Sequence, residues 1–95
     1  MFLGAYHFDG DPEALTAAHQ QLLNRFPLAS LELHVCIRRD DGITVLDACP
    51  SREVFVSFSS SPEFAREVEA AGLPAPRVEL LGDVQFAHLR QPVSA

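Results

Sequence analysis

The sequence feature that most constrains the fold is a strict alternation of apolar and polar residues. Apolar side chains occupy every second position of the stretch, at Leu31, Leu33, Val35 and Ile37. The positions between them hold Glu32, His34, Cys36 and Arg38. Period two over this length is the pattern of a β-strand with two unlike faces. The pair Asp41-Gly42 follows, and both residue types tolerate the positive φ angles of a type I′ turn, so we expect a second strand to fold back on the first.

A two-residue turn at Asp41-Gly42 decides which side chains share a face of this hairpin. Cys36 then pairs with Asp47, and the apolar face comprises Val35, Ile37, Leu46 and Ala48. The other face carries His34, Cys36, Arg38, Val45 and Asp47. A three-residue loop with a bulge would move Asp47 to the apolar side and bury its charge without a partner. We therefore predict that Leu46 packs under the helices and that Asp47 lies on the face away from them.

The first part of the chain reads as a strand, a turn and a helix. Residues 2–8 form a short apolar run that ends at Asp9-Gly10-Asp11. Asp11 suits the N-cap of a helix and Pro12 its first position. The helix has an apolar stripe formed by Leu15, Ala18, Leu22, Leu23 and Phe26, and we expect Pro27 to terminate it. His19 lies on the same side as the stripe, where a histidine is usually a boundary residue, so we assign it no role.

The last part of the chain predicts two short helices and a strand. Ser51 can cap the first helix, the serines at 59–61 interrupt it, and Ser61-Pro62 begins the second. Gly72 is expected to end the second of these helices. A final strand is expected from Val78 to Leu89 with a bulge at Gly82, followed by a loose tail over residues 90–95.

Composition limits the class of protein. The 95 residues suit one domain, and 47% of them are hydrophobic. The net charge is −6 and no segment gathers basic residues, which disfavours nucleic acid as a partner. No apolar run is long enough to span a bilayer, so we do not expect the protein to bind or lie in a membrane. We expect a cytoplasmic protein. Cys36 and Cys49 have no metal-like spacing and should remain thiols.

The expected order of strand, helix, two strands, broken helix and strand is the ferredoxin-like βαββαβ arrangement, an α+β fold with four antiparallel strands and the helices on one face. Several segments carry a family resemblance: residues 7–14 (HFDGDPEA), 39–42 (RDDG), 51–55 (SREVF), 61–63 (SPE) and 71–74 (AGLP). With them the chain resembles small actinobacterial members of the dimeric α/β barrel superfamily over nearly its whole length.

The resemblance implies a homodimer, and the predicted sheet supports it. A sheet with helices on one face leaves an apolar open face, which a second copy would cover while enclosing a cavity. Relatives include cofactor-free monooxygenases, haem-degrading enzymes and muconolactone isomerase-like enzymes. The first two classes generally use a tryptophan and an asparagine near the pocket. This chain has no Trp, and its only Asn, Asn24, belongs to the predicted helix, so their residues are not carried over.

The candidate site residues come from the polar face of the hairpin. His34 and Asp47 lie diagonally across it, where a carboxylate could orient an imidazole as a general base or acid, or where the two could form a simple polar pair at an interface. Ligand-binding candidates are Tyr6, His7, Cys36 and His88. No metal or cofactor is expected: His34, Cys36, Asp47 and Cys49 are ligand types, but their spacing matches no metal motif. Cys36 lacks a nearby cation that would make it a nucleophile.

Two functions from different classes follow. The first is a homodimer that binds a small apolar or aromatic ligand in the inter-sheet cavity, or a partner, without a reaction. The second is a cofactor-independent monooxygenase-like or isomerase-like enzyme with His34 or His7 as acid/base.

Overall fold

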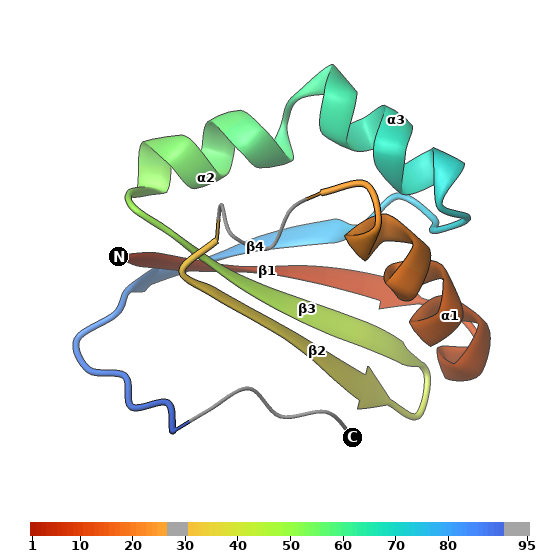
Figure 1. Cartoon of the computed structure of the whole chain (residues 1–95), viewed down its shortest axis with the longest axis horizontal. Helices are drawn as coiled ribbons and strands as arrows, with labels where there is room; N and C mark the ends of the chain where they lie inside the picture. Colours follow the sequence, from red (N-terminus) through yellow and green to blue (C-terminus); the bar gives the residue numbers. More distant parts are fainter. Residues whose placement is uncertain (27–30, 91–95) are drawn as a thin grey trace.

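A computed structural model describes residues 1–26 and 31–90. Its elements are β1 (Phe2–Asp9), α1 (Pro12–Leu23), β2 (Leu33–Arg39), β3 (Gly42–Cys49), α2 (Arg52–Ser59), α3 (Pro62–Ala70) and β4 (Arg77–Asp83). The four strands form one antiparallel sheet in the order β2-β3-β1-β4. This α+β arrangement is compatible with the ferredoxin-like fold predicted from the sequence (Figure 1).

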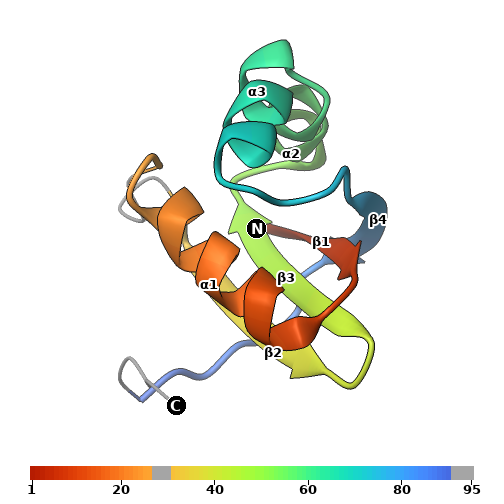
Figure 2. The ribbon, with the colours of Figure 1, turned by 90° about the vertical axis from the view of Figure 1, so that its right-hand side faces the viewer.

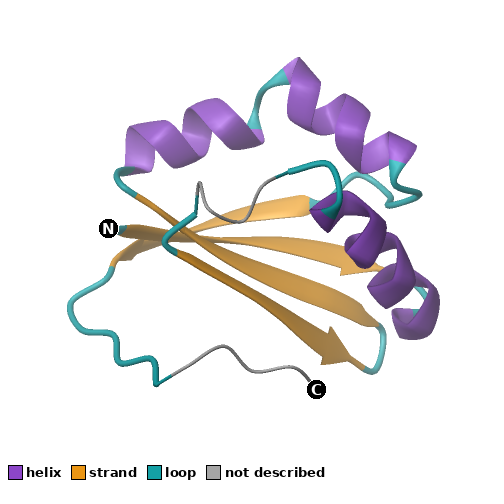
Figure 3. Ribbon diagram, in the orientation of Figure 1, coloured by secondary structure: helices purple, strands orange, loops and turns teal. Residues whose placement is uncertain are grey.

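The helices lie on one side of the sheet, and the segment after β4 runs on the other side (Figure 1). Helix α1 packs on β2 and β3, whereas α2 packs on β1, β3 and β4. Figure 2, turned by a right angle, shows α1 beside the pair α2 and α3. The other face of the sheet carries no helix, as Figure 3 makes plain.

The predicted helix caps are confirmed. Asp11 accepts a hydrogen bond from the amide of Ala14 at 3.0 Å, and Ser51 and Ser61 cap α2 and α3 in the same way. The break between α2 and α3 falls in the serine run, as predicted. Helix α1 ends earlier than expected, with Asn24 as its C-cap. Pro27, the predicted terminator, lies outside the described residues.

The predicted hairpin forms, but its turn is one residue earlier than expected. Arg39 pairs with Gly42, so the loop is Asp40-Asp41, and neither residue has a positive φ angle. Gly42 lies in β3 instead, where a Cβ atom would come within 2.0 Å of the carbonyl oxygen of Phe8. This glycine is needed for the close approach of two strands and not for turn geometry.

The hairpin side chains divide into the two predicted sets, but the predicted pairing and the predicted helix-facing side are wrong. Asp47 pairs with His34 and not with Cys36, and the His34 and Asp47 side chains face the helices. Leu46, which pairs with Ala5 and Val35, lies on the open face. The reason is that the helices pack on the larger side chains of the opposite face, those of Phe2, Tyr6, Phe8, Ile43 and Val45, all of which are buried. Asp47 has His34 directly opposite it, and not diagonally across as predicted.

The last strand is shorter than predicted. β4 ends at Asp83, and its register against β1 shifts between Leu80 and Gly82, which confirms the predicted bulge. Gly82 has a φ of +149°, a conformation that favours glycine. Of the predicted loose tail, residues 91–95 lie outside the described residues.

Aromatic rings fill the space between the sheet and the helices. Phe55 of α2 is fully buried and lies over Gly4, where a Cβ atom would come within 2.0 Å of the phenyl ring. Tyr6 contacts both Phe55 and Phe64, with ring centres 5.4 and 5.1 Å apart. This packing places the Tyr6 side chain beside His34 and Asp47 on the helix-facing side of the sheet.

Candidate functional site

His34 and Asp47 form a close pair beneath the helices. They lie directly opposite each other on β2 and β3, with His34 Nδ1 2.5 Å from Asp47 Oδ1. The side chains are only 15% and 8% exposed. Because a carboxylate can only accept, His34 Nδ1 carries the proton and donates to Asp47. The predicted association of these two residues is therefore seen, although on the opposite face of the sheet from the one predicted.

His19 of α1 completes a row of three groups with this pair. Its Nε2 lies 2.8 Å from Nε2 of His34, and the residue is buried. Burial, together with the nearby charge that His34 can carry, lowers the pKa of His19 below its usual value. The sequence placed His19 on the buried side of the helix, but no local signal shows that His34, fifteen positions later, would face it.

The Tyr6 hydroxyl lies in the same region and has no partner. Tyr6 is 2% exposed, and its Oη is buried without a hydrogen-bond partner among the described residues. Burial raises the pKa of Tyr6 above its usual value, and the charge of Asp47 raises it further. The group is therefore a neutral hydroxyl that can donate one hydrogen bond and accept another.

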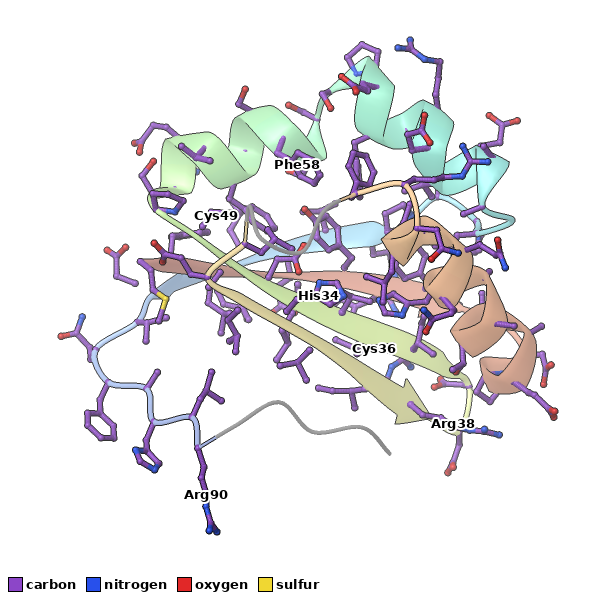
Figure 4. The ribbon with its side chains drawn as sticks, in the orientation of Figure 1. His34, Cys36, Arg38, Cys49, Phe58 and Arg90 are labelled. Carbon is purple, nitrogen blue, oxygen red and sulfur yellow. The ribbon has the colours of Figure 1, made fainter. Side chains whose placement is uncertain are left out.

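Tyr6, His34 and Asp47 share one small pocket with apolar side chains. Its cavity volume is about 40 Å³. The apolar lining comes from the sheet and from the helices, and Figure 4 shows Phe58 projecting from α2 toward the space that His34 faces. The lining residues besides the three polar ones are Phe8, Leu22, Leu23, Phe26, Leu31, Val45, Phe58 and Phe64. Such a lining, with a few convergent polar groups, is typical of a small-molecule site.

The two cysteines are free thiols near this region. Cys36 is on the helix-facing side of β2, and burial raises the pKa of its thiol. Burial also raises the pKa of Cys49, followed by the charges of Asp47 and Glu32. Both groups are therefore protonated near neutral pH, which makes them poor nucleophiles.

Of the predicted ligand-binding residues, Tyr6 lines the pocket, whereas Cys36, His7 and His88 do not. His7 is on the open face, where Nδ1 lies 2.9 Å from the Thr44 hydroxyl and Nε2 lies 2.8 Å from a carboxylate oxygen of Glu79. His88 was expected in the last strand, but it follows the end of β4 and is exposed. Neither residue lines the pocket.

His19, His34 and Asp47 lie in a row and do not surround a common point where a metal ion could bind. Within residues 1–26 and 31–90, no three His, Cys, Asp or Glu side chains are arranged so that they could hold a metal ion. In the same ranges, no helix is both long and apolar enough to cross a membrane. No protein-family model matches the chain, and a search of the curated proteins finds no match either.

Proposed function

We propose that this protein binds a small, uncharged and largely apolar molecule in the pocket beneath the helices, through an oxygen that accepts a hydrogen bond from Tyr6 Oη. The supporting observation is the buried hydroxyl without a partner among the described residues. An unpaired buried hydroxyl costs about 1–3 kcal/mol in folded proteins. A ligand oxygen at this position would recover that cost. The proposal moves the ligand from the inter-sheet cavity to the helix side, because Tyr6, His34 and Asp47 lie there.

The size of the cavity limits what can enter it. A water molecule needs roughly 10–15 Å³ by this measure, so about 40 Å³ accommodates only a few non-hydrogen atoms. The polar end of a ligand therefore occupies the cavity, and its apolar body lies along the surrounding Leu and Phe side chains. Such a ligand can be an alcohol or a phenol.

The charge of the pocket favours a neutral ligand. Asp47 is the acidic residue of the lining, and none of the described lining residues is Lys or Arg. A carboxylate ligand would meet the Asp47 charge in a poorly solvated site, where like charges repel strongly. A hydroxyl group avoids this repulsion and still offers an acceptor to Tyr6.

The test is a titration of the methyl-labelled protein with 1-hexanol and with hexanoate, followed by NMR. We expect 1-hexanol to shift the methyl signals of Leu22, Leu23 and Val45 in a saturable manner, and hexanoate to leave them unchanged. The methyl groups of Val54, which is 46% exposed on α2, serve as the control. Equal shifts with both compounds, or shifts no larger than those of Val54, would refute the proposal.

We also propose that a second copy covers the open face, as in the dimeric α/β barrel superfamily that the sequence resembles. The support is the set of partly exposed apolar side chains on that face, Leu3, Val35, Ile37 and Leu46. Covering apolar surface is worth about 25 cal/mol for each Å² before the cost of association. Light scattering should give a dimer for the wild type and for Val54→Arg, and a monomer for Leu46→Arg. A monomeric wild type at micromolar concentration would contradict the proposed dimer.

A second candidate function is acid–base catalysis by His34, which the contact with Asp47 favours because a carboxylate orients an imidazole and stabilises its protonated form. The same geometry limits access of a substrate to His34. His34 Nε2 contacts His19, so it could reach a substrate only after His19 moves away. If screening of phenols for oxygen uptake or isomerisation finds a substrate, His34→Ala should abolish turnover. Full turnover by that variant would exclude this function.

A further inference from the structure

The contact between His19 and His34 depends on how many protons the two rings hold. Their Nε2 atoms are 2.8 Å apart, their ring centres are 5.1 Å apart and their planes differ by 5°. The rings therefore meet edge to edge in nearly one plane, which is the geometry of an N–H···N hydrogen bond. Such a bond needs a hydrogen on one nitrogen and a lone pair on the other.

The Asp47 contact fixes the protons of His34. Because His34 Nδ1 donates to Asp47, a neutral His34 has an unprotonated Nε2 and accepts a hydrogen bond from His19. One added proton is tolerated, since His34 can then donate from both nitrogens, to Asp47 and to a neutral His19. A second added proton places two N–H groups and two positive charges head to head, and the contact cannot persist.

We propose that His19 and His34 form an acid-sensitive latch that fastens α1 to the sheet and that opens when the pair takes up a second proton. Helix α1 forms one wall of the pocket, because its Leu22 and Leu23 side chains line it. Both residues lie about one helical turn after His19. Opening the latch therefore loosens the wall on that side. The latch rests on the described contacts and not on the proposed ligand.

The groups that face His19 do not compensate for a second proton. Asp47 on β3 is the carboxylate in contact with the pair, and it already balances the first proton. Tyr6 on β1 and Cys36 on β2 keep their own protons, because burial raises the pKa of each. The Arg25–Glu67 ion pair, 2.8 Å long, joins the end of α1 to α3 but is partly exposed and does not touch His19.

The test is NMR of ¹⁵N-labelled imidazoles and ¹³C-labelled methyl groups from pH 8 to 4.5. We expect the pair to take up its two protons in separate steps, because the second proton places two positive charges in contact. The methyl signals of Leu22 and Leu23 should move only with the second step. The exposed His88 is the internal reference, and His88→Gln should leave both steps unchanged.

A matched variant separates the latch from a general effect of acid. In His19→Gln, the second step should vanish and the Leu22 and Leu23 signals should stay fixed over the same pH range. If this variant does not fold, the wild-type titration decides alone. The proposal is wrong if the two rings take up protons in one step, or if the second step leaves the methyl groups of α1 unchanged.

Discussion

Replacing Tyr6 with phenylalanine should stabilise the free protein. The substitution keeps the ring and its contacts with Phe55 and Phe64 but removes a hydroxyl that is buried without a partner among the described residues. Most polar substitutions in a core cost stability because they break a hydrogen bond. Here the described residues make no such bond, so the substitution removes only the burial penalty of the hydroxyl.

The expected gain is about 1–2 kcal/mol, the lower part of the range for an unpaired buried hydroxyl. For a domain of this size, each kcal/mol raises the Tm by roughly 4–8 °C. Tyr6 is the only tyrosine and the chain has no tryptophan, so unfolding should be followed by far-UV circular dichroism in urea and not by fluorescence.

Thr44→Val is the matched control. It also removes a buried hydroxyl, but the Thr44 oxygen accepts a hydrogen bond from Arg39 Nε at 2.9 Å and contacts His7. We expect this variant to lose about 1–2 kcal/mol. If Tyr6→Phe loses as much stability as Thr44→Val, the Tyr6 hydroxyl has a partner in the free protein, such as a bound water, and the reasoning is refuted.

Three further predictions concern packing, pH and the site. Gly4→Ala should destabilise the protein by about 1–3 kcal/mol in urea unfolding, because a Cβ atom would come within 2.0 Å of the Phe55 ring, and adding Phe55→Leu should recover part of this loss. Since the pKa of His19 is lowered in the folded state, the stability that the neutral ring contributes is present above about pH 6.5 and is lost as the pH falls below it. Urea unfolding at pH 7.5 and 5.5 should show this loss in the wild type and less of it in His19→Gln; equal losses would contradict the assignment. His34→Ala, which leaves Asp47 buried without its partner, should weaken 1-hexanol binding, whereas Cys36→Ser and Cys49→Ser should retain most of it; a silent His34→Ala would contradict the site.

The fold was largely predictable because its signals are local. Asp11, Ser51 and Ser61 each cap a helix through a hydrogen bond to a residue three positions later, so the sequence alone places the helix starts. Strand alternation likewise separates the hairpin into two sets of side chains. Local patterns of this kind suffice for the βαββαβ order.

The choice of face could not be predicted from the hairpin. Alternation states which residues lie together but not which set the helices cover. That choice depends on β1, whose Phe2, Tyr6 and Phe8 side chains are the larger set, and on the register between β1 and β3. The sequence interpretation assigned Val35, Ile37, Leu46 and Ala48 to the helices because they are the apolar set. The set that contains His34 and Asp47 is covered instead, and these two residues are each other's hydrogen-bond partner there.

The site was predictable only in part for the same reason. His34 and Asp47 were identified from residue types on one face of one hairpin. His19 joins them through a contact between a helix and a strand, and the unpaired Tyr6 hydroxyl is visible only once the surrounding rings are placed. Both depend on tertiary packing, which no local pattern records.

The most direct test of the central claim is the NMR signal of Tyr6 itself. Because the chain has one tyrosine, ¹³Cζ-labelled tyrosine gives a single signal that reports hydrogen bonding at the hydroxyl. We predict that 1-hexanol shifts this signal in a saturable manner, at the same concentrations that move the Leu22 and Leu23 methyl groups, and that hexanoate does not. A signal that stays fixed while 1-hexanol saturates the methyl shifts, or that does not respond to the alcohol at all, would contradict the assignment of Tyr6 as the ligand's hydrogen-bond donor.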